Sequence, residues 1–346
     1  MCEQTLPQDN LVARLKFVGR FVAFPLFAIV GYIPLAMGWP NDHWLTELIL
    51  VGLLSYSWFC VGGLSHELVH GNLKTPKWFQ HSAAHVIGTF IGIPLTVYRE
   101  SHLRHHAYLN TPLDNELWPY SNPRMSLGFR RIFVWFDVLF GIVAAPLIYG
   151  SVCFHRQIPL RPEIRRRVRF EYSAVVVFWT TTVVGLTWAH RTGLITLTVH
   201  DLIFIAPLAI ASSMNSLRKL TEHLGMSSYD PVMGTRTVIG DNVLTKLFSY
   251  FDFDLAVHGP HHRHPRLPHT QLADRMREFQ AEQPDAELPV YSSFAAVVAD
   301  TVRCMIRNPG VGVNAGGHTD LAHLPGLSAD SDGDCVVPVE PTRRAA

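Results

Sequence analysis

Four apolar segments in this chain are long enough to cross a lipid bilayer, and they restrict the possible folds more than any other feature. A membrane-spanning helix needs about 20 predominantly apolar residues. The segments cover residues 21–39, 44–64, 172–189 and 202–220. Only 16% of all residues are charged, whereas about a quarter are charged in a typical soluble domain. The sequence therefore predicts an all-α integral membrane protein with a four-helix transmembrane bundle.

Arginines between the second and third segments indicate how these helices are oriented. Residues 155–169 contain six arginines, and basic loops of this kind stay on the cytoplasmic side. We therefore expect both chain ends and everything from residue 65 to 169 on that side. Two further apolar runs, 86–97 and 132–154, should dip into the membrane and return. A single crossing by the run 132–154 would place either the arginines or the preceding histidines outside.

This orientation predicts a multi-pass protein of a bacterial inner membrane or the endoplasmic reticulum, with its site on the cytoplasmic face. Residues 1–20 form a cytoplasmic N-terminal segment in this interpretation, and residues 21–310 form the membrane domain. Residues 311–346 are rich in Gly, Asp, Ser and Pro. Segments of that composition bury too little apolar surface to fold, so a disordered C-terminal tail is expected.

Nine histidines recur in four clusters and are the candidate functional residues. They are His66 and His70; His102, His105 and His106; His223; and His258, His261 and His262. Spacings of three and four residues place side chains on one face of a helix. Every cluster falls at or near the cytoplasmic end of a predicted membrane segment, so we expect them to converge in a cytoplasmic helical cap. Imidazole binds iron, copper and zinc, and nine imidazoles exceed the ligands of one tetrahedral zinc. The pattern therefore favours two metal ions.

Other histidines and a second enzyme class also need to be considered. Residues 66–70, HELVH, match the HExxH motif of zinc proteases, in which the glutamate acts as a base. No third histidine follows at metzincin spacing, so a membrane metalloprotease is the weaker hypothesis. His81 and His85 share the four-residue spacing and are interpreted as interfacial. His264 and His269 flank the last cluster and either contact the site or lie at the surface.

The order and spacing of the clusters resemble the membrane fatty-acid desaturase family. The boxes His66-x-x-x-His70, His102-x-x-His105-His106 and His258-x-x-His261-His262 match its three-histidine-box pattern. The segment ending in His223 resembles the one that supplies a ninth ligand in many members. The resemblance covers roughly residues 21–269. It implies that the nine histidines are catalytic and bind two irons as a non-haem di-iron centre, with dioxygen as co-substrate.

The same resemblance implies a long acyl chain, carried by a lipid or a thioester, as the substrate that gains a double bond. Relatives also include lipid hydroxylases and carotenoid ketolases, so oxygen insertion stays open. No cytochrome b5 haem motif is found in the sequence, and electrons would come from a separate protein of the ferredoxin, rubredoxin or cytochrome b5 type. A formal net charge of +1 argues against nucleic-acid binding.

Polar residues near the boxes are candidates for the surroundings of the cofactor. Asp254 lies four residues before His258, where some family members carry asparagine. Asn215 shares a helix face with Arg218 and Glu222. Asp254 and Asn215 are therefore predicted to contribute to cofactor binding by orienting an imidazole or holding a water molecule. The alternative for Arg218 and Glu222 is a plain ion pair at a helix end.

Two features after the second box complete the prediction. Asp114 and Glu116 resemble an acidic pattern that is common at this place in the family. Trp118 is a candidate for the lining of a substrate entrance. A narrow tunnel among Leu, Ile, Val and Phe side chains would admit an acyl chain from the bilayer.

Overall fold

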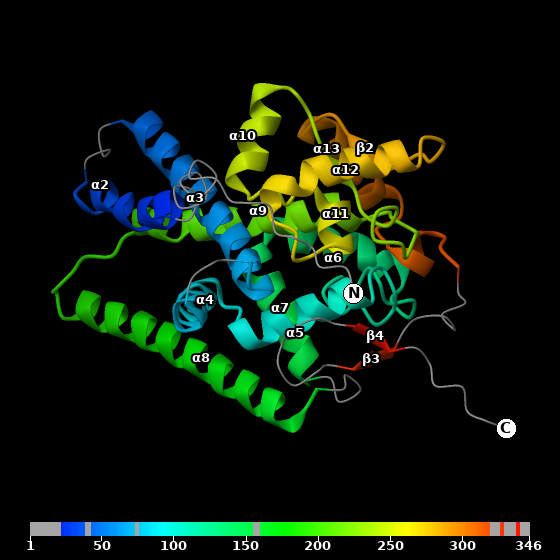
Figure 1. The fold of residues 1–346 in the computed structure, drawn as a ribbon. Coiled ribbons are helices and arrows are strands. Elements are labelled where there is room, and N and C mark those ends of the chain that lie inside the picture. Colours follow the sequence, from blue (N-terminus) through cyan, green and yellow to red (C-terminus); the bar gives the residue numbers. More distant parts are fainter. Residues whose placement is uncertain are drawn as a thin grey trace.

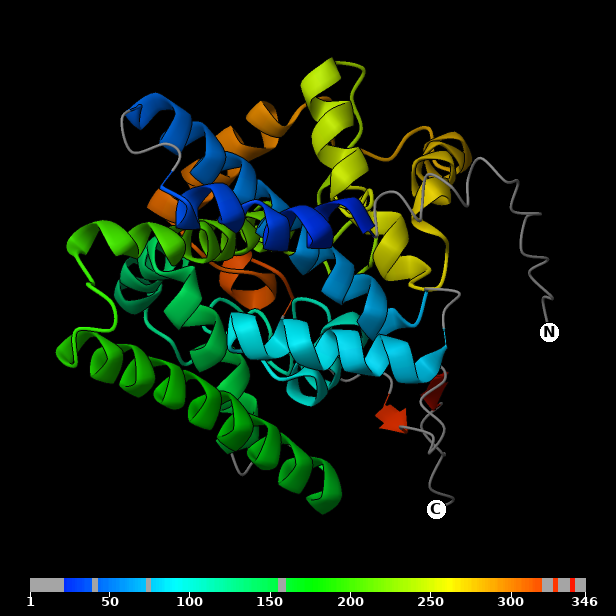
Figure 2. The ribbon, with the colours of Figure 1, turned by 90° about the vertical axis from the view of Figure 1, so that its left-hand side faces the viewer.

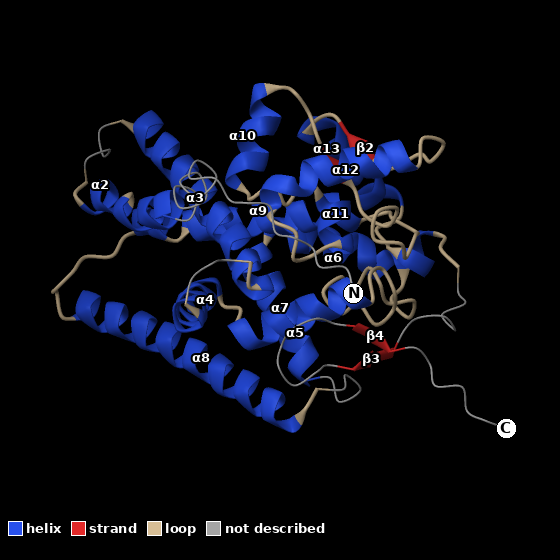
Figure 3. Ribbon diagram, in the orientation of Figure 1, coloured by secondary structure: helices blue, strands red, loops and turns tan. Residues whose placement is uncertain are grey.

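A computed structural model describes residues 22–38, 43–72, 76–154 and 160–318, and the backbone of two short strands beyond them. The described residues are mostly helical, in agreement with the predicted fold class (Figure 3). The helices are α2 (Tyr32–Ala36), α3 (Trp44–His70), α4 (Lys77–Ile91), α5 (Leu95–Ala107), α6 (Leu127–Leu139), α7 (Gly141–Phe154), α8 (Pro162–Arg191), α9 (Ala206–His223), α10 (Val243–Phe251), α11 (His258–Arg263), α12 (Leu272–Glu282) and α13 (Phe294–Arg307).

Short elements connect and terminate these helices. The 3-10 helices are η1 (Val199–Phe204), η2 (His269–Gln271) and η3 (Gly312–Ala315). Strand β1 (Thr237–Val238) pairs in parallel with β2 (Val290–Tyr291), and β3 (Gly326–Ser328) pairs antiparallel with β4 (Val337–Val339). Strands therefore make a minor contribution to the fold.

Two of the described helices, α3 and α8, are long and apolar enough to cross a membrane. The pair formed by α6 and α7 passes the same test as one broken span, which gives up to three crossings. Helix α8 lies at the periphery in both views (Figure 1 and Figure 2). Only 6% of its most apolar window is buried within the chain, compared with 56% for α3. Its apolar side chains therefore face outward, as expected of a helix surrounded by lipid.

The other two predicted spans are shorter than expected. An apolar helix over Val22–Ala36 falls below the length of a span. The run 202–220 is divided, because η1 ends at Phe204 and Pro207 begins the first turn of α9. The four-helix bundle and the cytoplasmic cap thus stay predictions, while two or three crossings are supported.

The ambiguous apolar run 132–154 forms α6 and α7, which are bent by 120° relative to each other. This bend fits the predicted return toward the side of entry. Asp137, an unusual residue for an apolar helix, is fully buried in α6. Its Oδ2 accepts hydrogen bonds from Tyr120 Oη at 3.0 Å and Lys219 Nζ at 2.9 Å. The pairing with a cation and a hydroxyl compensates for the burial of the carboxylate.

The run 86–97 also reverses direction. Helix α4 ends at Ile91, and the next residue, Gly92, has a φ of +73° in the left-handed region, as glycine often does after a helix. Pro94 then precedes α5. The predicted dip is therefore the turn that joins α4 to α5, and it fixes the start of the helix that carries the second histidine box.

A hydrophobic cluster beneath the histidine boxes joins distant parts of the chain. Leu64 and Leu68 of α3 pack with Leu95 of α5 and with Phe253 and Leu255, which precede α11. Helix α3 also packs along α9. Since these four helices carry the histidine clusters, this core places all the clusters near one another.

The predicted C-terminal tail is ordered at its start, and this corrects the boundary at residue 311. Val311 is fully buried, and its amide donates to the carbonyl of Tyr120 at 3.2 Å. The amide of Gly312 donates to the carbonyl of Met226 at 2.8 Å. Residues far away in the sequence therefore hold residues 311 and 312 in place, and amino-acid composition does not reveal such contacts. Apart from β3 and β4, the tail after residue 318 lies outside the described residues, as do residues 1–20.

Candidate metal centre

The nine predicted histidines come together from four helices, α3, α5, α9 and α11, whose places in the fold are labelled in Figure 1. His66 and His70 lie in the last two turns of α3, and the second box occupies the C-terminal half of α5. His223 is the last residue of α9, and the third box forms most of α11. Seven of these side chains are buried and two are half-buried. The convergence predicted from the spacing is therefore present in the structure.

The imidazoles form two groups, and within each group the donor atoms lie within 4.8 Å of one another. The five-imidazole group contains His66, His70, His102, His106 and His261. The four-imidazole group contains His105, His223, His258 and His262. Helices α5 and α11 contribute to both groups. The groups are in contact, because the rings of His106 and His262 stack with centroids 4.2 Å apart.

The ring nitrogens of each group converge through Nε2. In the five-imidazole group, His102 Nε2 lies 2.9 Å from His70 Nε2 and 3.1 Å from His106 Nε2. In the four-imidazole group, His223 Nε2 lies 3.2 Å from His105 Nε2 and 2.9 Å from His258 Nε2. The Nε2 atoms of each group thus lie close together around one small volume, and a cation requires such an arrangement of nitrogen lone pairs.

Acceptors behind the rings select the tautomer that leaves Nε2 free. Asp114 Oδ2 lies 2.8 Å from His105 Nδ1, and Glu116 Oε2 lies 3.1 Å from His102 Nδ1. The backbone carbonyl of Leu255 lies 3.2 Å from His258 Nδ1. A proton held on Nδ1 by such an acceptor leaves the Nε2 lone pair for a metal.

One further atom shows that the residues fit metal ions. His66 Nε2 is buried, and among the described residues it has no hydrogen-bond partner. A buried nitrogen without a partner is costly, and a bound cation would satisfy it. Neutral imidazoles suit iron, copper and zinc, and the nine nitrogens are enough for two ions.

The electrostatics also favour neutral ligands. Burial, together with the neighbouring imidazoles, lowers the pKa well below its ordinary value for His106, His223, His258, His261 and His262. A histidine must be unprotonated at the coordinating nitrogen to bind a metal. His105 differs: burial opposes its charged form, but the carboxylates of Asp114, Glu116 and Glu222 together outweigh burial and raise the pKa to about 9. This ring must lose a proton when it becomes a ligand.

The two acidic residues that follow the second box, Asp114 and Glu116, therefore contact histidines of that box directly. Asp114 is fully buried and also accepts the backbone amide of Asn110 at 3.1 Å. The second oxygen of Glu116 accepts from Tyr149 Oη at 2.9 Å. Burial opposes ionisation of Glu116, but His102, His105 and the Tyr149 hydroxyl together outweigh burial and lower the pKa to about 2. Tyr149 was missed, and a lone hydroxyl within an apolar run was the only signal for it.

The pair of Arg218 and Glu222 is buried beside the four-imidazole group. Arg218 Nη1 lies 3.6 Å from Glu222 Oε1, and Glu222 Oε2 lies 3.5 Å from His258 Nε2. Arg218 Nε also lies 3.8 Å from Asp252 Oδ2, and Asp252 is itself buried. Both interpretations left open by the sequence describe this pair: it is an ion pair at the end of α9, and it lies beside the predicted ligands. Asp252 was missed, because nothing in its spacing sets it apart.

The contacts of Asp254 and Asn215 involve neighbouring protein groups. Asp254 Oδ1 accepts from Ser249 Oγ at 3.1 Å, and Asn215 Nδ2 donates to the carbonyl of Ala211 at 3.1 Å. Asn215 also lies against Gly62 of α3, where a Cβ would come within 2.8 Å of its amide. Their role in cofactor binding stays a prediction.

The four other histidines singled out by the sequence, His81, His85, His264 and His269, lie outside the two imidazole groups. In the described part of the chain, neither His81 nor His85 belongs to an imidazole group. His269 Nδ1 lies 3.9 Å from Glu67 Oε2, behind the first box. His264 stacks against Phe279 with ring centroids 6.0 Å apart. The ring of Trp118 lies 5.2 Å from that of Phe133, and its place at a substrate entrance stays a prediction.

Comparison with known proteins agrees with this geometry. The family model described as "Fatty acid desaturase" matches residues 42–294, a range that includes all nine histidines. A search among curated proteins finds no match to this chain. Because the matched range covers most of the chain and contains both imidazole groups, the protein belongs to the fatty acid desaturase family.

Proposed function

We propose that this protein is an O2-dependent di-iron desaturase that introduces a double bond into the acyl chain of a lipid or an acyl thioester. The observation that carries the proposal is the convergence of nine histidines into two imidazole groups in contact. Each group would hold one iron. The irons would activate dioxygen: two hydrogens from adjacent carbons of the substrate, two electrons from a separate protein and two protons from solvent would together reduce one dioxygen to two waters.

The residues of the chain position the proposed ligands and keep water away from them. Asp114, Glu116 and the Leu255 carbonyl fix the rings of three ligands from behind. Burial of the imidazoles keeps bulk water from the site, which protects a reactive centre from side reactions. The apolar helices α3 and α8 associate this centre with a membrane, where long acyl chains are found.

The alternative of a zinc protease is less well supported. A catalytic zinc keeps three protein ligands and one open position, but His66 and His70 belong to a group of five imidazoles. The glutamate of the motif, Glu67, contacts His66 Nδ1 at 3.4 Å and accepts from Asn72 Nδ2 at 3.2 Å. Two irons per chain, not one zinc, is therefore the proposed metal content.

Lipid analysis tests the reaction. We expect a host that expresses this chain to accumulate acyl chains that have lost two hydrogens, and mass spectrometry of total lipids would measure them. The control is the double variant His105→Ala, His106→Ala, which removes one imidazole from each group. Chains that have gained oxygen would instead indicate a hydroxylase or a ketolase. Unchanged lipids in a host that supplies iron and an electron donor would contradict the proposal.

The proposed topology is multi-pass, with the site on the cytoplasmic face of a bacterial inner membrane or the endoplasmic reticulum. Its support is the pair of apolar helices α3 and α8 and the arginines at the start of α8. In a background without natural cysteines, Arg166→Cys should react with a membrane-impermeant thiol reagent only after the cytoplasmic side is opened. Thr192→Cys, at the other end of α8, should react from outside. Labelling of Arg166→Cys from outside would reverse the orientation.

A further inference from the structure

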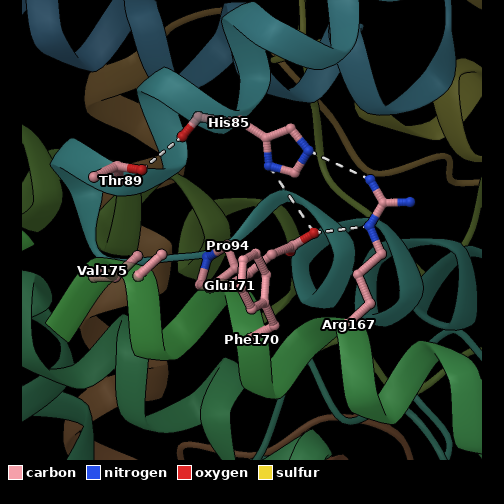
Figure 4. A pocket seen from close by; sticks show the side chains of 8 residues that line it. His85, Thr89, Pro94, Arg167, Phe170, Glu171 and Val175 are labelled. Carbon is pink, nitrogen blue, oxygen red and sulfur yellow. Dashed lines mark hydrogen bonds and ion pairs between the residues drawn. The ribbon is translucent and has the colours of Figure 1, made fainter. Parts of the chain in front are cut away.

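A pocket of about 330 Å³ lies between α8 and the turn that joins α4 to α5, separate from both imidazole groups (Figure 4). This volume is at the lower end of the range for small-molecule sites, about 300–1,000 Å³. Four polar and four apolar residues line it: His85, Thr89, Arg167 and Glu171, and Pro94, Phe170, Ala174 and Val175. The pocket therefore combines a charged end with an apolar end.

The charged end presents a cation toward the pocket. Arg167 Nε donates to Glu171 Oε1 at 3.0 Å, and Arg167 Nη2 lies 3.4 Å from His85 Nε2 (Figure 4). Glu171 also accepts from the backbone amide and the hydroxyl of Thr96 at 3.0 and 2.6 Å. Its carboxylate is thus already shared with the first turn of α5. Arg167 Nη1 has no hydrogen-bond partner within the described ranges, and 56% of the Arg167 side chain is exposed.

The pocket lies where the side chains of α8 change from mainly basic to mainly apolar. Arginines dominate its first two turns, and apolar residues follow from residue 174 onward. Phe170 is 73% exposed although it is aromatic. One turn beyond Val175, Trp179 Nε1 donates to the carbonyl of Thr89 at 3.0 Å and holds α8 against α4. Arginine and tryptophan occur at this boundary where a helix passes from the headgroup layer into the hydrocarbon.

We propose that this pocket binds an anionic phospholipid. His85 Nε2 accepts from Arg167, and His85 Nδ1 lies 4.0 Å from Glu171 Oε1. The phosphate would therefore contact the Nη1 side of Arg167, and the beginning of an acyl chain would lie against Phe170 and Val175. Arginine suits phosphate because its planar guanidinium donates two parallel hydrogen bonds. Basic pockets between membrane helices bind anionic headgroups for the same reason. The charge of the α8 start selects an anionic lipid over a zwitterionic one, and this proposal does not depend on the desaturase reaction.

Thermal unfolding of the detergent-purified full chain tests the proposal. Phosphatidylglycerol should raise the apparent Tm by about 3 °C more than phosphatidylcholine with the same acyl chains, because a ligand that binds only the folded state stabilises it. The extra shift should disappear in Arg167→Gln, which removes the cation. It should also disappear in Ala174→Phe, which fills the apolar end from an exposed position and keeps every charge.

Val176→Phe is the matched control, since Val176 is 60% exposed on the same helix and does not line the pocket. This variant should keep the full shift. If Arg167→Gln does not fold, Ala174→Phe decides the outcome. Equal shifts with both lipids, a full shift in Ala174→Phe, or the same shift with inorganic phosphate alone would each overturn the proposal.

Discussion

Replacement of His258 by alanine is expected to halve the iron content and lower desaturase activity at least about 100-fold. His258 belongs to the group that has only four imidazoles. Its Nε2 lies 2.9 Å from His223 Nε2 and 3.0 Å from His262 Nε2, so it stands between two other ligands. Loss of this ring leaves three imidazoles, and loss of an outer contact alone typically costs about 10- to 100-fold in metal affinity or activity.

Elemental analysis of the purified protein would measure the result. We expect about two irons per chain in the natural protein and about one in His258→Ala, because nine nitrogens of this type suit two ions. His81→Ala is the matched control: His81 is an exposed histidine at ligand-like spacing that lies outside both groups. This control should keep both irons. A full iron content in His258→Ala, or about one zinc in the natural protein, would refute the assignment.

Replacement of Asp114 by asparagine is expected to weaken metal binding about 10- to 100-fold without removing a ligand. Asp114 Oδ2 lies 2.8 Å from His105 Nδ1 and also accepts the amide of Asn110. Asparagine keeps the size of the side chain but lacks the charge, and one of its two terminal atoms is a donor. His105 then loses the partner that fixes its ring and its tautomer.

In a chelator titration, Asp114→Asn should release its iron at a lower chelator concentration than the natural protein. A melting curve of the same sample would show whether the variant is still folded. The control is Asp241→Asn. Asp241 is a fully exposed carboxylate that pairs with Lys246 at 2.9 Å, and it has no contact with a histidine in the described structure. Identical chelator curves for Asp114→Asn and the natural protein would show that Asp114 does not support the metal site.

Sequence spacing was sufficient to predict the histidine site because spacing within a helix is a local property. His102, His105 and His106 must lie on one face of α5 wherever that helix packs, and the same holds for the box on α11. Long apolar runs likewise predicted α3 and α8, since the length of a span depends only on bilayer thickness. The family followed from these boxes, and the match over residues 42–294 confirmed it.

Residues that support the site from distant parts of the chain could not be predicted from spacing within a helix. Asp252 and Tyr149 support the site, but each does so only after its element has packed against another. The order of residues 311–318 depends on contacts with Tyr120 and Met226. The apolar run 202–220 is divided between η1 and α9, and Pro207 at the start of α9 was the sequence signal for that break.

The sequence by itself identified the nine histidines that converge in the two imidazole groups, because helical periodicity fixes which residues share a face. Only the tertiary structure decided how they divide into five and four. His105 turns toward His223 while His102 and His106 join the first box, and α11 divides in the same manner. That division depends on how the helices that carry the histidines pack against one another, as α3 does along α9, and contacts across the whole fold set this packing.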